Sequence, residues 1–351
     1  TNATGSAALG KAVRGITLSH SKNIQIVPWG DTPNIIAGND ELDIFLVSSK
    51  HNTISDNIIG LNRTRKKVLD IQETVGILFQ DDADSNLVQN NYIGSPWIGV
   101  NVALGSSHNQ ITNNFIGTDE NWILEAGARL EGIRIWEASD NVVTKNTIGF
   151  CTTGVLVTKA SSLGNVIAEN AIANNSDKGI ENSEGGNNML AAPSVLAISP
   201  TQIEGISVGG KMVEIYCDDF DQGQVFLGTA TADAAGNWVY LLSSEPPLAN
   251  ITALARDDNG NTSEFSTPIK VGVDNFMNGQ PMAFHLEQNF PNPFNPTTRI
   301  NFSIAKQSHI SLKIYNVLGK EISTLINRLM DSGEYDVAFD GFGLAPGIYF
   351  Y

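Results

Sequence analysis

Short apolar strands separated by asparagine-rich turns repeat through residues 1–192. The pattern N-x-[IV]-x-x-N occurs six times, and most copies run on into x-I-G. Eight to eleven residues before most copies lies a second short strand that begins with glycine, as at Gly76, Gly99, Gly132 and Gly154. Within the strands apolar and polar residues alternate, without the periodicity of a helix. The pattern therefore predicts an all-β repeat.

The spacing of the glycines defines the repeating unit. Gly76 and Gly132 lie 56 residues apart, and Gly99 and Gly154 lie 55 apart, so the unit comprises two coils. The extra residues of alternate coils fall in two long loops, 61–75 and 118–131. Pairs of short strands in coils of fixed length predict a parallel β-helix, in which neighbouring coils lie about 4.8 Å apart.

The last asparagine of each motif copy occupies one register of the predicted coils. We expect these side chains to form a hydrogen-bonded ladder from coil to coil, because an amide both donates and accepts. This structural role is favoured over a polar binding stripe. The ladder residues are Asn39, Asn57, Asn91, Asn114, Asn146 and Asn170.

The repeat, together with the segment TNATGSAALG at residues 1–10, resembles bacterial right-handed β-helix repeat proteins. In that family a T-x-A-T-G-x-x-x-L-G loop usually follows the I-G of a preceding coil. The resemblance implies a right-handed parallel β-helix over residues 1–192. It also implies that Thr1 lies within a repeat and that further coils precede it.

Composition changes at residues 191–193, and residues 193–273 predict a small β-sandwich. Alternating strands follow one another at intervals of 8–14 residues, with turns rich in Asp, Asn and Gly between them. The stretches 228–238 and 255–265 resemble an Ig-like module often found directly after such β-helices. The aspartates of the turns could bind Ca²⁺, which takes several oxygen ligands. Capping of the turns by these side chains is the commoner use, and no other cofactor or metal is expected.

After a polar linker, 274–283, comes the most specific motif of the chain. Residues 284–296 contain FHLEQNFPNPFNP, and IYNVLG, GEYDV and APGIYF follow in order. Residues 284–351 thereby resemble the type A C-terminal sorting domain of the type IX secretion system. The residues that carry the motif are Asn292, Pro293, Phe294, Gly319 and Gly347.

That resemblance implies a second small β-sandwich and a route of export. The expected partner is the type IX secretion machinery, which would take the protein through the periplasm and across a Gram-negative outer membrane to be released or anchored at the surface. In the family the chain usually continues beyond this point with a hairpin and a basic tail. We therefore expect the final strands to be missing here.

Charge and cysteine content exclude several classes of function. The chain has 37 acidic and 21 basic residues and a net charge of −16, which disfavours binding to nucleic acid or anionic membranes. Cys151 and Cys217 lie far apart without metal-ligand spacing, so neither a disulfide scaffold nor a zinc site is expected. No apolar run approaches the roughly 20 residues of a transmembrane helix.

Acidic side chains fall in the turn between the two strands of successive coils. Asp82 lies in one coil, His108 in the next, and Glu137 and Asp140 in the third. Carboxylates two coils apart would be separated by roughly 10 Å, near the upper end of the roughly 6.5–9.5 Å found in inverting glycosidases. A glycoside hydrolase site is one hypothesis. The alternative is that these residue types simply populate tight turns.

Two further hypotheses concern the outer surface. A polysaccharide lyase needs a base and a cation, which Arg134 and the basic residues 63–67 of the first long loop could supply. Trp122 and Trp136 are predicted to face outward and could stack on sugar rings; the alternative is that they cover the core beneath a loop. We favour a secreted or cell-surface protein with a structural, adhesive or glycan-binding role, and the rival hypothesis is a polysaccharide-degrading lyase or hydrolase.

Overall fold

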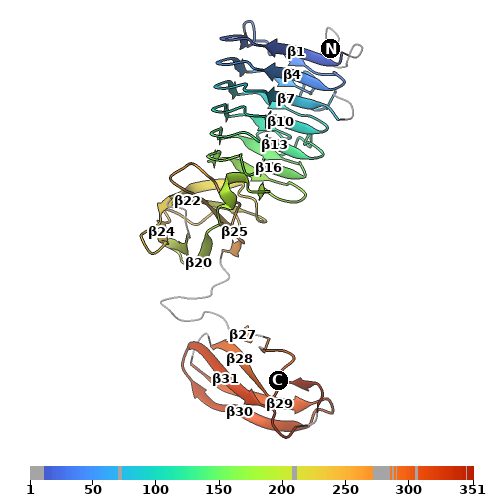
Figure 1. Cartoon of the computed structure of the whole chain (residues 1–351). Helices are drawn as coiled ribbons and strands as arrows, with labels where there is room; N and C mark the ends of the chain where they lie inside the picture. Colours follow the sequence, from blue (N-terminus) through green and yellow to red (C-terminus); the bar gives the residue numbers. More distant parts are fainter. Residues whose placement is uncertain are drawn as a thin grey trace. The chain divides into compact units, whose positions relative to one another are not determined.

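The structure, a computed structural model, describes residues 12–69, 73–207, 212–271, 285–286, 288–289, 291–304, 307–344 and 346–351. The coils and the module that follows them form one compact unit, and residues 272–351 belong to a second (Figure 1). The segment 1–10 and the predicted linker 274–283 lie outside the described residues. Among the described residues nearly all regular structure is β, apart from a 3-10 turn at Gly186–Met189.

The first unit begins with three parallel sheets, to which successive coils contribute one strand each. The first sheet contains β1 (Arg14–Ser19), β4 (Leu42–Val47), β7 (Val75–Gln80), β10 (Ile98–Ala103), β13 (Glu131–Trp136), β16 (Thr153–Thr158) and β19 (Ile180–Ser183). The second contains β2 (Gln25–Ile26), β5 (Thr53–Ser55), β8 (Leu87–Gln89), β11 (Gln110–Thr112), β14 (Val142–Thr144) and β17 (Val166–Ala168). The third contains β3 (Ile35–Ile36), β6 (Ile58–Ile59), β9 (Tyr92–Ile93), β12 (Phe115–Ile116), β15 (Thr147–Gly149) and β18 (Ala171–Ala173).

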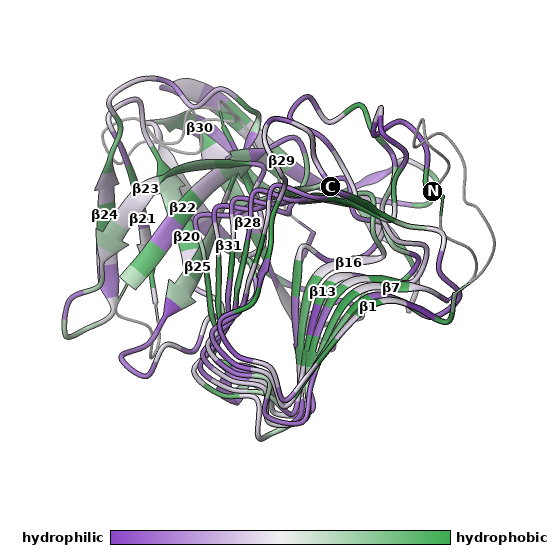
Figure 2. Ribbon diagram, turned by 90° about the horizontal axis from the view of Figure 1, so that it is seen from above, coloured by the Kyte–Doolittle hydropathy of each residue, from purple (hydrophilic) through white to green (hydrophobic). Residues whose placement is uncertain are grey.

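Successive strands superimpose when the coils are viewed from above, as Figure 2 shows for β1, β7, β13 and β16. This arrangement confirms the predicted parallel β-helix. Like residues stack in register, so that Ile77, Val100, Ile133 and Val155 form one fully buried column. Burying each such side chain contributes about 1.5–3 kcal/mol, and the stacking repeats this contribution in every coil.

A column of glycines explains why the strands of the first sheet open as they do. A Cβ on Gly76, Gly99, Gly132 or Gly154 would lie only 2.5–2.8 Å from a backbone carbonyl oxygen of the next coil. On its other side it would lie 2.7–3.1 Å from an isoleucine of the third sheet. The backbone therefore approaches both neighbours too closely for any side chain.

Two antiparallel sandwiches follow the coils. The sheets of the Ig-like module are β20-β21-β24 and β23-β22-β25-β26, and those of the sorting domain are β27-β28-β31 and β30-β29-β32. The module comprises β20 (Ser194–Ile198), β21 (Gln202–Ile206), β22 (Met212–Asp218), β23 (Val225–Thr231), β24 (Asn237–Leu241), β25 (Asn250–Arg256) and β26 (Ile269–Lys270). The sorting domain comprises β27 (His285–Leu286), β28 (Thr297–Ile304), β29 (Ser308–Asn316), β30 (Glu321–Met330), β31 (Gly333–Asp340) and β32 (Tyr349–Phe350).

We predict that Gly132→Ala lowers the free energy of unfolding of the β-helix by about 1–3 kcal/mol, because the added methyl group overpacks the core. Urea unfolding followed by circular dichroism measures the change. The control is Gln110→Ala, an exposed position of β11. Equal stability of the two variants would contradict the close approach described for the glycine column.

Candidate functional site

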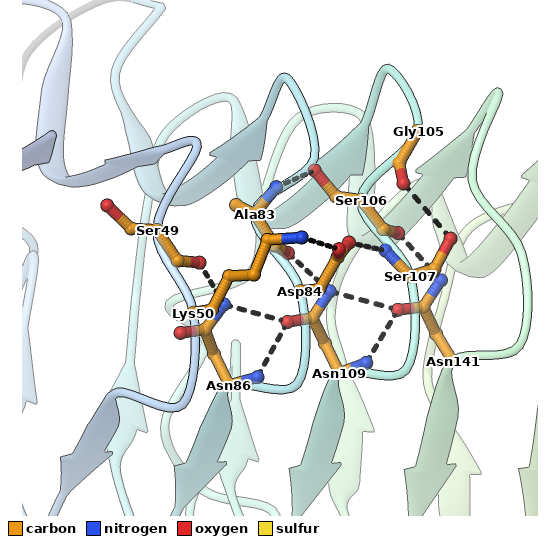
Figure 3. Close-up of polar contacts among 10 residues, drawn as sticks. All are labelled: Ser49, Lys50, Ala83, Asp84, Asn86, Gly105, Ser106, Ser107, Asn109 and Asn141. Carbon is orange, nitrogen blue, oxygen red and sulfur yellow. Dashed lines mark hydrogen bonds and ion pairs between the residues drawn. The ribbon is translucent and has the colours of Figure 1, made fainter. Parts of the chain in front are cut away.

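Two columns of buried asparagines run along the coils, one at each end of the second sheet. The backbone N–H and the side-chain amide of one asparagine both donate to Oδ1 of the asparagine in the next coil, at 2.9–3.1 Å. We call each such pair of hydrogen bonds a rung. Figure 3 shows such rungs between Asn86, Asn109 and Asn141. Complete rungs join Asn52, Asn86, Asn109, Asn141 and Asn165 in the first column, and Asn57, Asn91, Asn114, Asn146 and Asn170 in the second.

Each amide also reaches back to the preceding coil. Nδ2 of Asn114, for example, donates to the backbone carbonyl of Val88 at 3.0 Å, and Nδ2 of Asn109 donates to that of Ala83 at 2.9 Å. One side chain thus connects three coils, and its hydrogen-bonding groups are used within the protein. These asparagines hold the backbone together and leave little of their polarity for a ligand.

The prediction for Asn39 was wrong. The pairing of Ile35 with Ile58 places Asn34 in the second column, where its Nδ2 donates to Oδ1 of Asn57 at 2.8 Å. Asn39 instead donates to Oδ1 of Asp43 at 2.6 Å. The first described coil carries its motif copy in a different register, so that the first asparagine of that copy, rather than the last, joins the second column. The first column was not predicted, although the first asparagine of most motif copies supplies it.

The turn between the first and second sheets contains the predicted hydrolase residues. Asp82, His108, Glu137 and Asp140 all have a left-handed backbone, with φ between 52° and 61°. Asp, Asn and His tolerate this conformation better than other residues with side chains, which accounts for three of the four. The coils bring His108 and Asp140 to equivalent positions, each directly before an asparagine of the first column.

Two of these carboxylates lie against glycines of the next coil. A Cβ on Gly105 would lie 2.6 Å from Oδ1 of Asp82, and one on Gly164 would lie 2.5 Å from Oδ1 of Asp140. The neighbouring Asp84 has two partners: its carboxylate forms an ion pair with Nζ of Lys50 at 2.7 Å and accepts from the Ser107 N–H at 2.9 Å (Figure 3). Asp84 therefore also connects three coils, and its hydrogen bond raises the pKa of Lys50.

One basic residue of the first long loop, Arg65, lies beside an aromatic stack. The guanidinium of Arg65 lies 4.0 Å from the ring centre of Tyr92, whose ring stacks on Phe115 at 4.7 Å. Glu120 of the second long loop accepts from the Tyr92 hydroxyl at 3.1 Å and lies 4.0 Å from the Arg65 guanidinium. Tyr92 and Glu120 thus join the two loops, and a carboxylate offsets the Arg65 charge that a lyase site would use.

Arg134 lies on the outer face of the first sheet. The Arg134 guanidinium pairs with the Glu131 carboxylate at 2.8–2.9 Å. Arg134 belongs to a row of half-buried side chains that crosses this face in register, one from each of the strands β7, β10, β13, β16 and β19. The members of the row are Leu78, Asn101, Arg134, Leu156 and Glu181. Trp136, also half-buried, ends the same strand as Arg134 and lies on this side of the sheet. We call this surface, with Trp136, the outer row.

The tryptophans do not form one group. Trp97 packs into an apolar cluster separate from the main core, with Leu42, Val75 and Ile98 at the starts of first-sheet strands. The ring of Trp122 instead contacts the third sheet, since a Cβ on Gly149 would lie 2.9 Å from its Cζ3. Trp29, for which no role was predicted, is 97% exposed.

The predicted motif of the sorting domain lines one cavity. This space of about 930 Å³ brings together segments from both ends of the domain, among them Asn292, Pro293, Phe294, Gly347 and Tyr351. The ring of Phe294 also packs edge-on against Phe339, with 5.8 Å between centres. Gly319 lies apart, in the turn between β29 and β30, where its φ of 72° suits glycine.

Few other groups in the described ranges suggest metal or thiol chemistry. Burial raises the pKa of Cys151 to about 12, so its thiol stays protonated. Among the described residues no three His, Cys, Asp or Glu side chains gather as a metal site. The Asp218 carboxylate accepts from the N–H groups of Phe220, Gln222 and Gly223, as a turn cap does. The Ca²⁺ hypothesis stays a prediction.

Two protein families match parts of the chain. Residues 2–131 match the family described as periplasmic copper-binding protein (NosD), and residues 288–351 match the secretion system C-terminal sorting domain. The chain is a right-handed β-helix repeat protein with a type IX sorting domain. No curated protein is significantly similar to this β-helix protein. In the part of it that the structure describes, no helix is long and apolar enough to cross a membrane.

Several solved structures are distantly similar. The enzymatically active domain of tailspike protein 2 from bacteriophage CBA120 is 10% identical, with 95% of this chain and 52% of that chain covered and a TM-score of 0.26. A mutant tailspike protein of E. coli bacteriophage HK620, solved with a pentasaccharide, is 14% identical, with 74% and 53% covered and a TM-score of 0.21. The β-helix protein spans about half the length of these chains, and at such TM-scores the matches carry no argument about its function.

We predict that Asn114→Ala lowers the free energy of unfolding by at least about 2 kcal/mol. The substitution removes the acceptor of the Asn91 backbone N–H and the side-chain donor to the Val88 carbonyl, and each unpaired buried group costs about 1–3 kcal/mol. Chemical denaturation measures the loss. Asn113→Gly, at the exposed neighbouring position, is the control and should change stability far less. A neutral Asn114→Ala would show that the rung is dispensable.

Proposed function

We propose that this secreted protein binds extracellular polysaccharide on the outer row and does not cleave it. The sorting domain accounts for export, and the outer surface of a Gram-negative cell is the destination we propose. The β-helix then presents a long, regular surface to the medium, which suits a long, regular ligand.

The observation that carries the proposal is the chemistry of the outer row. Asn101 and Arg134 are half-buried in this row, with Oδ1 of Asn101 and Nε of Arg134 buried, and their remaining nitrogens can donate to sugar hydroxyls. Leu156 beside them adds half-buried apolar surface. Trp136, at the end of the same strand, adds an aromatic ring of the kind that packs on sugar faces at low entropic cost. Because the coils are in register, these groups stand at intervals of about 4.8 Å along the solenoid.

Charge favours a neutral glycan over a polyanionic one. The Arg134 cation is already paired with Glu131, and Glu181 lies further along the same row. The chain as a whole carries a net charge of −16, which repels uronate or sulfate groups. The Asp84 carboxylate of the turn is engaged by Lys50 and Ser107, which supports binding without catalysis.

The test is a panel of neutral and anionic polysaccharides, with binding and new chain ends measured together. We expect a neutral glycan to bind, and Asn101→Ala/Trp136→Ala to weaken it at least tenfold. This double variant leaves the Arg134–Glu131 pair in place. The control is Gln89→Ala/Thr112→Ala, at half-buried positions of the second sheet, which should bind as the wild type does.

Two results would contradict the proposal. Equal binding by both double variants would remove the outer row from the site. New reducing or unsaturated ends that disappear in Asp140→Ala or Arg134→Ala would make the protein a polysaccharide-degrading enzyme.

A further inference from the structure

We propose that the Ig-like module, residues 194–271, is a built-in cap that replaces the next coil and prevents a second copy of the chain from adding to that end of the β-helix. This inference is independent of glycan binding. It makes the module a functional part of the solenoid.

The clearest sign is a rung whose last member belongs to the module. The Cys151 N–H donates to Oδ1 of Asn175 at 3.0 Å, as in the asparagine columns. The Asn175 N–H and Nδ2 then both donate to Oε1 of Gln222, each at 3.0 Å. Gln222 returns a bond from Nε2 to the Asn175 carbonyl at 2.8 Å. A glutamine of the sandwich thus occupies the place of the next asparagine.

Other acceptors of the module pair with further N–H groups of the last coil, whereas the Asn165 N–H donates to Oδ1 of Asn187. Oδ1 of Asn261 accepts from Gly164 at 2.7 Å, and Oγ1 of Thr262 accepts from Ile167 at 2.9 Å. Oε2 of Glu214 accepts from Glu169 at 2.8 Å, and the Gly223 carbonyl accepts from Ile172 at 3.1 Å. In earlier coils these N–H groups find acceptors on the following coil. Here mostly side chains supply them, one by one.

The apolar core is closed in the same way. Tyr216 and Leu254 of the module are buried in one cluster with the isoleucines of the coils. Phe226 and Phe265 pack on Tyr216, with ring centres 5.3 and 5.4 Å away. Three aromatic rings therefore cover the end of the hydrophobic interior, which would otherwise face water.

The cap matters because β17, β18 and β19 are the last strands of their parallel sheets. An uncovered strand edge pairs readily with another chain, and a second copy of this β-helix would offer a matching edge. Side-chain acceptors and a sandwich set on that edge satisfy its N–H groups and offer no ladder to extend. The partner that the cap excludes is therefore another copy of the same chain.

The test uses the full chain with Gln222→Leu/Thr262→Val, which removes two acceptors and keeps the side chains similar in size. Hydrogen exchange should accelerate at least tenfold at Ile167 and Asn175, and light scattering should show association that grows with protein concentration. The matched control is Thr229→Val/Thr231→Val, at exposed positions of β23, and should behave as the wild type.

Exchange in β7, β10 and β13 reports whether the coils stay folded. Preserved protection there, with faster exchange at the capped edge, is the expected result. A monomeric variant with unchanged exchange at Ile167 and Asn175 would overturn the proposal. Loss of protection from exchange throughout β7 to β13 would also overturn it, because the module would then stabilise the whole β-helix and not only its last coil.

Discussion

The structure depends on one interaction: a buried amide oxygen that accepts two N–H groups from the coil before it. In a solenoid without helices, the turns between sheets leave backbone N–H groups that no ladder satisfies, and burying them unpaired would be costly. Asparagine meets this need because its side chain is short, accepts at one end and donates at the other. The rung fixes the register of each coil, and the register stacks the isoleucines and glycines of the core.

Because the asparagines pair the buried N–H groups of the turns, the side chains of the outer surface are free to vary. The long loops can leave and rejoin the solenoid because the rungs on either side hold the coils in place. The two loops are then joined by the contacts among Arg65, Tyr92 and Glu120. The outer row uses the same register for a different purpose, since it repeats surface groups at the coil spacing. Gln222 of the module accepts both N–H groups of Asn175 in the same way, and this last rung ends the solenoid.

Much of the fold could be predicted from the sequence because the repeat places equivalent residues at equivalent intervals. The parallel β-helix, the second asparagine column from Asn57 onward and the sorting domain follow from motifs of this kind. The register of the first described coil could not be predicted, since Asn34 and Asn39 both fit the motif and only strand pairing distinguishes them. The cap could not be predicted either, because Gln222 and Thr262 belong to no repeat and contact the coils only in the tertiary structure.

The candidate site was predicted less well, for a physical reason. Asp82, His108 and Asp140 are residue types that suit both catalysis and a left-handed turn, and a sequence does not separate the two uses. Trp122 and Trp136 were both predicted to face outward, yet Trp122 lies in a loop against the third sheet and Trp136 ends a strand of the first. Arg134 was a candidate base or cation of a lyase site, and its pairing with Glu131 could not be predicted, because residues three apart in a strand ordinarily point to opposite faces.

Residue-resolved hydrogen exchange of the unmodified protein tests the central claim most directly. If rungs hold the coils and the module supplies the last of them, the N–H of Asn175 should be protected to within about tenfold of the N–H groups of Asn86 and Asn109. The same should hold for Ile167, which donates to Thr262. Exchange at Asn175 and Ile167 that is a thousandfold faster than at Asn109 would contradict the claim, because the last coil would then be an open edge.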